Sequence, residues 1–453
     1  MKKLLMMIGA AAVAVGAYAD TPITNTINGV EWRFRIDSAT GTAMLGLNTT
    51  PIPASADRTK DEFHACASTV NVDAADIPWE FDYDGVHYTV TKVGSCAFFQ
   101  HKTTTLTGTL TIPSSVTDVL GYAFQTCTGL TKLIGGDSVT NWQNCALSGC
   151  SNLTGSYPDL TGVKVFGEQP FSAAPLTGVF NIDSWTFIQG WGFRNTTYTN
   201  AIIPSTVTTV GRNSAAYGVF FECSNMEALW VKGKPTEASQ TYTTVYCGSL
   251  LKKCTSMKLA LMGQNTKGEL MTEASDNAML NGVDGVQVLV PDNGYWDDLV
   301  TGGGENNKVW YYGPNRELDL TIDDEAMKAT FAPTTENALT NAIAWAPILK
   351  ERFNLDTVVA ITNRIDTSLA ITEAMLQNVT LEAPPWFLTF SVTSQAQLDN
   401  VLAAVSVDTP IIIDIEGAGR NQITVPNGRK VAILAKSGWT FGKALKGIVV
   451  SFH

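Results

Sequence analysis

One short phrase recurs through the first half of the chain: an aromatic or aliphatic residue, two positions, a cysteine, two positions, and a leucine or methionine. Its four full copies are centred on Cys127, Cys150, Cys223 and Cys254. Weaker copies place another residue in the cysteine position, namely His101, Ala174 or Thr196, so the position recurs every 22 to 31 residues. Self-similarity at this period is the signature of stacked repeats. Since one repeat cannot bury its own apolar face but stacked neighbours can, the phrase predicts a solenoid.

The apolar positions of the phrase predict the interior of that solenoid. Free cysteine is among the most buried residue types, so we expect the repeat cysteines to pack between successive rungs. The predicted structural core is Phe98, Phe124, Cys127, Leu130, Cys150, Leu153, Phe220, Cys223, Met226, Cys254 and Met257. Whether the other four cysteines (Cys66, Cys96, Cys145 and Cys247) form disulfides is left open, because a sequence alone cannot assign disulfide connectivity. The chain has no Cys-x-x-Cys pair, so neither a structural metal site nor a cofactor is predicted.

The N-terminus has the pattern of an export signal. Lys2 and Lys3 precede an apolar run, and Ala17-Tyr18-Ala19 forms a small-x-small cleavage site, so residues 1–19 are predicted to be a cleaved signal peptide. No later segment has the roughly 20 uninterrupted apolar residues that a membrane span needs. We therefore expect a protein that is secreted or held at the cell surface by a partner.

Charge narrows the choice of partner. Loss of the two signal lysines leaves 28 basic residues against 42 acidic ones, a net charge of −14. Nucleic-acid binding needs clustered Lys and Arg to neutralise phosphates, so the composition argues against a nucleic-acid partner. The expected partner is a protein or a glycan.

Composition and patterning divide the mature chain into three parts. Residues 20–76 contain one alternating strand pattern and are expected to form an N-terminal β cap, because terminal repeats need a cover. Residues 77–300 hold the repeat array. Residues 315–453 differ in kind: apolar spacing predicts helices over 336–353 and 395–405, with β-rich stretches between and after them. The predicted fold is therefore a mainly β, curved repeat solenoid with an N-terminal β cap and a small C-terminal α+β domain.

Two near-identical segments identify the kind of repeat. Leu110-Thr111-Ile112-Pro113 and Ala201-Ile202-Ile203-Pro204 each place a short strand before a proline, with a further apolar pair after it. Together with the cysteine phrase, they resemble the BspA-type leucine-rich repeat over about residues 77–290. The resemblance implies a curved, exported solenoid that commonly serves as a surface adhesin or ligand-binding protein. It implies no defined ligand.

Catalytic motifs are absent from the sequence, and no catalytic residue is predicted. The chain has no His-Glu-x-x-His helix, Gly-x-Ser-x-Gly turn or phosphate-binding loop. Asp414 and Glu416 share one face of a predicted strand, a spacing that a glycosidase could use. Two alternatives to a non-enzymatic binding protein therefore stay open. One is a carbohydrate-active enzyme whose C-terminal part, which faintly resembles the start of a parallel β-helix, is catalytic. The other is a structural envelope or assembly protein.

Trp230 is the candidate ligand-binding residue. In the register that buries Leu229 and Val231, Trp230 points outward and offers a ring for a sugar or a partner's side chain. A slip of one residue buries Trp230 instead. The sequence thus favours an exported, non-enzymatic adhesin-like protein that binds a protein or glycan on the solenoid face. Ligand identity, oligomeric state, anchoring and calcium dependence are left open.

Overall fold

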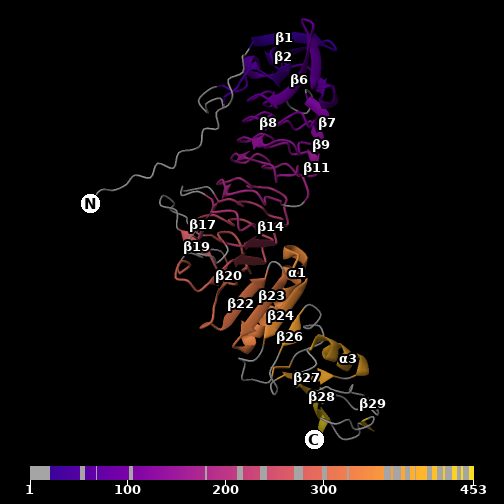
Figure 1. Ribbon diagram of the computed structural model, residues 1–453, viewed down its shortest axis with the longest axis vertical. Coiled ribbons are helices and arrows are strands. Elements are labelled where there is room, and N and C mark those ends of the chain that lie inside the picture. Colours follow the sequence, from indigo (N-terminus) through magenta and orange to yellow (C-terminus); the bar gives the residue numbers. More distant parts are fainter. Residues whose placement is uncertain are drawn as a thin grey trace, which may run out of the picture.

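Two columns of short parallel strands run along the long axis of the molecule (Figure 1). The structure is a computed structural model that describes residues 21–50, 57–67, 69–100, 106–178, 181–211, 218–234, 242–269, 279–297, 304–323, 326–361, 369–370, 379–382, 388–392, 394–405, 411–415, 422–423, 431–435, 440–441 and 448–452. The predicted signal peptide and His101 lie outside these ranges. No helix in the described ranges is long and apolar enough to cross a membrane.

The first column, face 1, consists of one strand from each repeat. Its strands are β6 (Val86–Val93), β8 (Asp118–Val119), β10 (Asn141–Trp142), β12 (Val165–Phe166), β13 (Phe187–Ile188), β15 (Thr209–Val210), β17 (Thr243–Tyr246) and β19 (Thr266–Glu269). Neighbouring strands pair in parallel, with a break between β12 and β13.

The second column, face 2, includes the two strands that precede Pro113 and Pro204 and the corresponding strands of the other repeats. Its strands are β4 (Val72–Asp73), β7 (Leu106–Ile112), β9 (Leu130–Gly135), β11 (Thr154–Gly155), β14 (Asn200–Ile203), β16 (Ala228–Val231), β18 (Leu259–Met262) and β20 (Gln287–Pro291). They are also parallel. Between β11 and β14, a single bridge from Ser156 to Thr177 continues the column among the described residues. The two faces confirm a repeat solenoid with its core between them.

A tight turn containing the cysteine phrase joins the two faces in each repeat. In the turn around Phe98, Cys96 and Gln100 adopt left-handed backbone conformations, with φ of 59° and 57°. A left-handed residue with a side chain costs about 1–2 kcal/mol. Backbone hydrogen bonds between rungs offset this cost, as where Phe98 N–H donates to the Ala123 carbonyl at 2.6 Å. The turns therefore form a third hydrogen-bonded ladder along the array.

The predicted core residues all lie in the interior cluster that fills the array. Phe98 and Phe124 stack with ring centroids 5.1 Å apart. The Cys150 thiol donates to the Phe124 carbonyl at 3.1 Å, and Cys127, Cys223 and Cys254 donate to the corresponding carbonyl of the rung before them. Burial raises the pKa of Cys150 to about 12, so its thiol keeps the proton that it donates. All eight cysteines are present as thiols.

Three strands precede the array: β1 (Thr21–Ile27), β2 (Val30–Asp37) and β3 (Thr42–Leu45). They form an antiparallel meander whose last strand pairs in parallel with β6. Trp32 is buried against Phe98 of the first rung, with ring centroids 6.3 Å apart. Two 3-10 helices, Asp61–Phe63 and Ala74–Asp76, and the hairpin strand β5 (Glu80–Tyr83) complete this end.

Face 2 does not end with the array. The sheet that begins at β14 continues through β21 (Lys308–Tyr312), β22 (Leu318–Asp323), β23 (Lys328–Pro333), β24 (Thr357–Ile361) and β26 (Thr380–Glu382). Helix α1 (Glu336–Phe353) connects β23 to β24 and packs on the outer side of this sheet (Figure 1). The change in sequence character near residue 315 is therefore not a break in the sheet.

The last part of the chain is a separate parallel sheet. Its strands are β25 (Leu369–Ala370), β27 (Leu388–Val392), β28 (Ile411–Ile415), β30 (Val431–Ala435) and β32 (Ile448–Phe452), accompanied by the pair β29 (Gln422–Ile423) and β31 (Thr440–Phe441). Helix α3 (Gln395–Ala404) connects β27 to β28. Both helices begin where the apolar spacing predicts them.

Candidate functional site

The outward side of the late face 2 strands is apolar and covered. Parallel register aligns Ile202, Trp230 and Leu261 in one row across β14, β16 and β18. The row continues through Leu289 of β20 to Trp310 of β21. Trp230, Leu261, Leu289 and Trp310 are buried in a second core, which contains α1 and is distinct from the solenoid interior.

Trp230 points outward, as one of the two registers predicts, but the expectation that it is exposed is wrong. Leu229 and Val231 lie in the solenoid interior, while the Trp230 ring is only 3% exposed. Phe353 of α1 packs against it, with ring centroids 5.5 Å apart. The outward tryptophan is covered because the protein supplies its own partner helix.

Local sequence places α1 for this contact. The Thr335 side chain accepts the Ala338 N–H at 3.1 Å and caps the first turn. Asn354 ends the helix in a left-handed conformation with φ of 57°. The buried side of the helix includes Leu339, Trp345 and Phe353. Trp345 meets Trp310 edge to face at 5.5 Å.

Glu227 connects the helix to the array electrostatically. Its carboxylate accepts from Lys258 at 3.0 Å and from Arg352 of α1 at 3.0 and 3.2 Å. The hydrogen bond from Lys258, together with that from Arg352, lowers the pKa of Glu227 below its ordinary value. The Arg352 carbonyl also accepts from the Asn200 side chain at 2.9 Å. These contacts hold the C-terminal end of α1 beside β14 and β16.

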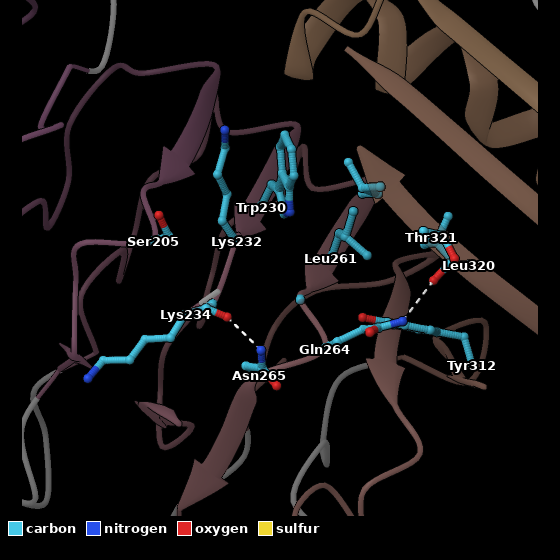
Figure 2. Close-up of a pocket in the computed structure, with 13 residues that line it drawn as sticks. Ser205, Trp230, Lys232, Lys234, Leu261, Gln264, Asn265, Tyr312, Leu320 and Thr321 are labelled. Atoms are coloured by element: carbon cyan, nitrogen blue, oxygen red, sulfur yellow. Dashed lines mark hydrogen bonds between the residues drawn. The ribbon is translucent and has the colours of Figure 1, made fainter. Parts of the chain in front are cut away.

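A pocket of about 330 Å³ opens beside Trp230, where the ends of β16 and β18 meet β22. We call it the junction pocket (Figure 2). Its apolar lining residues are Trp230, Leu261, Tyr312, Leu320 and Ile322. Its size lies at the lower end of the range that small-molecule sites occupy. Several segments that are widely separated in sequence, from Ser205 to Ile322, therefore build one site.

Polar side chains line the mouth of the junction pocket, and some are fixed by the backbone. Asn265 donates to the Lys234 carbonyl at 2.6 Å, and Gln264 donates to the Leu320 carbonyl at 3.4 Å (Figure 2). Each side-chain amide can form further hydrogen bonds beyond this one. Ser205 and Thr321 add hydroxyl groups.

Lysines dominate the charge of the junction pocket. Among the described residues that line it, Lys232 and Lys234 are the charged ones, and neither carboxylate nor imidazole is present. The Lys232 ammonium lies 4.7 Å from the centroid of the Trp230 ring, a cation–π contact. Tyr312 donates to the Met262 carbonyl at 2.6 Å, and burial raises its pKa well above the usual range, so the phenol is neutral. The pocket is thus positive in a chain with a strong excess of acids.

Glycine shapes the floor of the junction pocket. A Cβ atom on Gly263 would lie 1.9 Å from the Lys232 carbonyl, so only glycine permits this approach between neighbouring rungs. Gly233 has φ of 75° and turns the chain directly after Lys232. Pro113 follows β7 and Pro204 follows β14, whereas β16 and β18 are followed by Lys232-Gly233 and Gly263-Gln264.

Gly136 also follows β9, so a glycine after a strand does not by itself signal the site. Trp230 was predicted from the sequence, whereas Lys232, Lys234, Gln264 and Asn265, which line the same pocket, were not. The predicted core residues lie in the solenoid interior rather than at this site. Glu416 and the side chain of Asp414, which carry the enzyme alternative, lie outside the described residues.

A second hollow of about 530 Å³ lies on face 1 beside β12 and β13. Phe166, Trp185 and Phe187 line it, together with Lys164. Phe187 is 46% exposed, while Trp185 is buried and donates to the Leu160 carbonyl. The hollow has fewer polar side chains than the junction pocket, so we take the junction pocket as the candidate site.

Comparison with known proteins bears on the array. Residues 91–227 match the family model of the BspA type leucine rich repeat region, in six copies. None of the curated proteins matches the chain.

Three solved structures are similar to the chain at low identity. A leucine rich cell surface protein from Faecalibacterium prausnitzii A2-165 is 16% identical, with a TM-score of 0.34 over 65% of this chain and 96% of that one. A leucine-rich repeat protein from Bacteroides ovatus ATCC 8483 is 14% identical, with a TM-score of 0.21 over 65% and 89%. The pneumococcal vaccine antigen PcpA is 13% identical, with a TM-score of 0.33 over 87% and 99%.

Proposed function

Since residues 91–227 are BspA-type leucine rich repeats, we propose that this chain is an exported surface protein that binds its ligand in the junction pocket. The observation that carries the proposal is the composition of that pocket: an apolar wall, fixed side-chain amides and two lysines. Binding sites typically combine an apolar lining with a few polar groups placed to orient the ligand. Export rests on the signal pattern of residues 1–19 and on the resemblance to exported adhesins.

The proposed role is binding without catalysis. General acid–base chemistry needs a titratable side chain within reach of the reacting group. The described lining residues offer two lysines and a neutral, hydrogen-bonded tyrosine. These groups can orient and hold a ligand, and no acid–base pair among them supports turnover.

The rigid surroundings of the junction pocket also support a role in binding. The pocket lies between strands of one continuous sheet, and its floor is fixed by backbone hydrogen bonds such as Gly263 N–H to the Val231 carbonyl at 2.7 Å. Rigid surroundings reduce the entropy lost on binding. Stacked repeats supply this rigidity because each rung is held by its neighbours.

A blocking variant tests the proposal on the mature chain. Thr321 lines the pocket on the exposed side of β22, and its cross-strand partner Thr330 does not line it. The mature protein, Thr321→Trp and the matched control Thr330→Trp are screened against immobilised glycans and extracellular matrix proteins. We expect saturable binding by the mature protein and the control, weakened at least about tenfold in Thr321→Trp. Equal binding by all three proteins would move the ligand site elsewhere.

A further inference from the structure

Face 1 is interrupted between β12 and β13, and the second hollow lies at this break. One rung later, Gly211 N–H donates to the Ile188 carbonyl at 3.0 Å and joins the ends of neighbouring strands. Among the described residues, the corresponding bond from the Gln189 N–H to the Phe166 carbonyl is not formed, and β12 and β13 belong to different sheets. Backbone groups at a strand edge without a paired neighbour are available to a ligand. The hollow of about 530 Å³ is lined by residues from both sides of this gap.

The gap exposes an aromatic ring that the repeat directs inward. Phe166 is aligned in parallel register with Trp142, which is fully buried in the solenoid interior. Phe166 itself is only half-buried and lines the hollow. Its ring lies 4.7 Å from that of Trp185, whose indole is fixed by donating to the Leu160 carbonyl at 2.9 Å. Phe187 adds an exposed ring, so the lining is largely aromatic.

Polar groups accompany these rings without creating a charged site. The polar lining residues are Thr161, Lys164, Ser184 and Thr186. Two acids adjoin the single lysine: Asp159 accepts from the Thr161 hydroxyl at 2.7 Å, and Asp183 precedes Ser184 in the chain. This balance of charge favours a neutral ligand. We propose that the hollow binds a neutral pyranose unit of a glycan, at a second site that is separate from the junction pocket.

A pyranose matches the two kinds of lining group. The C–H face of the ring is apolar and gains by covering the exposed aromatic surface of Phe166 and Phe187. The sugar hydroxyls both donate and accept, so they can bond to the Thr186 hydroxyl, the Lys164 ammonium and the Phe166 carbonyl. The volume of the hollow lies within the range of small-molecule sites.

The geometry of the break disfavours an extended peptide as the occupant. A peptide inserted as a strand would need roughly 9–10 Å between β12 and β13, twice the usual strand spacing. The two rungs are held together on either side of the gap, because the Ser184 hydroxyl donates to the Thr161 carbonyl and the Gln169 N–H donates to the Trp191 carbonyl at 3.1 Å. The ligand therefore lies over the gap and does not enter the sheet.

Ligand-observed NMR titration of the mature protein tests the ligand class. Methyl β-glucopyranoside is compared with sorbitol, which carries hydroxyl groups on an open chain and has no ring face. Glucuronic acid serves as the charged probe, and an acetylated, amidated Thr-Val-Thr-Val peptide serves as the strand-like probe. We expect saturable binding of the glucopyranoside with a Kd on the order of 1 mM, and binding at least about tenfold weaker for sorbitol and for the peptide. Glucuronic acid is expected to bind no more tightly than the neutral sugar.

Two aromatic variants locate the site. Phe187→Ala is expected to weaken binding of the glucopyranoside about tenfold, because it removes the exposed ring. Phe187→Tyr keeps a ring at this position and should retain most of the affinity. Ile134→Ala is the matched control, since Ile134 is similarly exposed but lies on β9 of face 2. Melting temperatures equal to that of the parent confirm that each variant is folded.

The contrary results separate this inference from the proposed function. Equal binding of sorbitol, tighter binding of glucuronic acid or of the peptide, or no saturation by the glucopyranoside at concentrations on the order of 100 mM would each refute the ligand class. Unchanged binding in Phe187→Ala would refute the site. If Thr321→Trp abolishes sugar binding and Phe187→Ala does not, the sugar occupies the junction pocket, so the proposed function stands and the second site is refuted.

Discussion

Face 2 begins with a polar outer side and ends with an apolar one. In β9, Lys132 and Ile134 point outward and are exposed, Ile134 by 44%. In β18, the outward residues Leu259 and Leu261 are fully buried beneath the covering second core. Both strands hold the same place in their repeats and both bury their inward residues in the solenoid. The comparison teaches that a repeat fixes which side a residue faces, while sequence elsewhere decides what covers that side.

The reason lies in how sheets bury their faces. A strand whose polar and apolar residues alternate has one face exposed to solvent, whereas a continuous apolar run is typical of a strand that is covered on both faces. The strand β9 mixes threonine, lysine and glycine with its apolar residues, whereas β16 and β18 read Ala228-Leu229-Trp230-Val231 and Leu259-Ala260-Leu261-Met262. The late strands are apolar on both sides, and the second core, which contains α1, covers the outer side.

The largest expected effect comes from placing a charge on each outer side. Leu289→Asp buries an unpaired carboxylate beneath the second core and is expected to lower the free energy of unfolding by about 4–5 kcal/mol. Ile134→Asp makes the same change at an exposed position and is expected to cost less than about 0.5 kcal/mol. Urea denaturation followed by circular dichroism measures both. Similar losses in the two variants would refute the difference between the two regions.

Removing a buried aromatic side chain from α1 tests how this helix stabilises the second core, without changing any residue of the array. Trp345 is 3% exposed and packs on Trp310. Trp345→Ala is expected to cost about 3–4 kcal/mol, because it leaves a cavity between helix and sheet. Hydrogen exchange locates the effect: amides of α1 should lose protection while those of the turn around Phe124 keep it. Phe187→Ala, at an exposed aromatic on face 1, is the control that should change neither.

The sequence predicts the array well because its core is local and repeated. Each rung contributes the same few side chains at nearly the same spacing, so Phe124, Cys127 and Leu130 identify their counterparts in other rungs. The two helices also follow from local apolar spacing. A period of two likewise assigns Leu229 and Val231 to the interior and Trp230 to the outer side.

The covered face and the junction pocket could not be predicted in the same way. Both depend on β22 and α1 meeting strands about 60–120 residues earlier in the chain, and no repeat spacing records that contact. The mistaken exposure of Trp230 has this cause. One local clue was present, the continuous apolar runs of β16 and β18.

Within the array, the cysteine position offers a comparison between two rungs. Cys150 donates to the Phe124 carbonyl, whereas the next rung has Ala174, which has no donor to offer the Leu147 carbonyl. Cys150→Ala is expected to cost about 1–2 kcal/mol, from one lost hydrogen bond and a small cavity. Ala174→Cys is expected to gain about 0.5–1 kcal/mol by adding that hydrogen bond. Thermal denaturation under reducing conditions checks the pair, and a loss of stability in both would show that the thiol acts by volume alone.

The smallest effect concerns the charge that joins the two regions. Glu227 pairs with Arg352 of α1 and with Lys258, whereas Glu222 pairs with Arg194 and Lys253 inside the array. Glu227→Gln is expected to cost about 0.5–1 kcal/mol at neutral pH, as for a partly exposed ion pair. Glu222→Gln should cost a similar amount but leave the protection of α1 amides unchanged. Hydrogen exchange at α1 in both variants separates the two roles.

Acid should abolish the Glu227 effect before it unfolds the protein. The pKa of Glu227 is lowered in the folded state, chiefly by the hydrogen bonds from Lys258 and Arg352. A lowered pKa adds stability above the ordinary carboxyl range, and that stability is lost as the pH falls through the folded-state pKa. The melting temperatures of the parent and Glu227→Gln should therefore differ at neutral pH and converge as the pH falls below the ordinary carboxyl range. A constant difference over this range would mean that Glu227 holds α1 by packing, and the electrostatic link between array and helix would have to be abandoned.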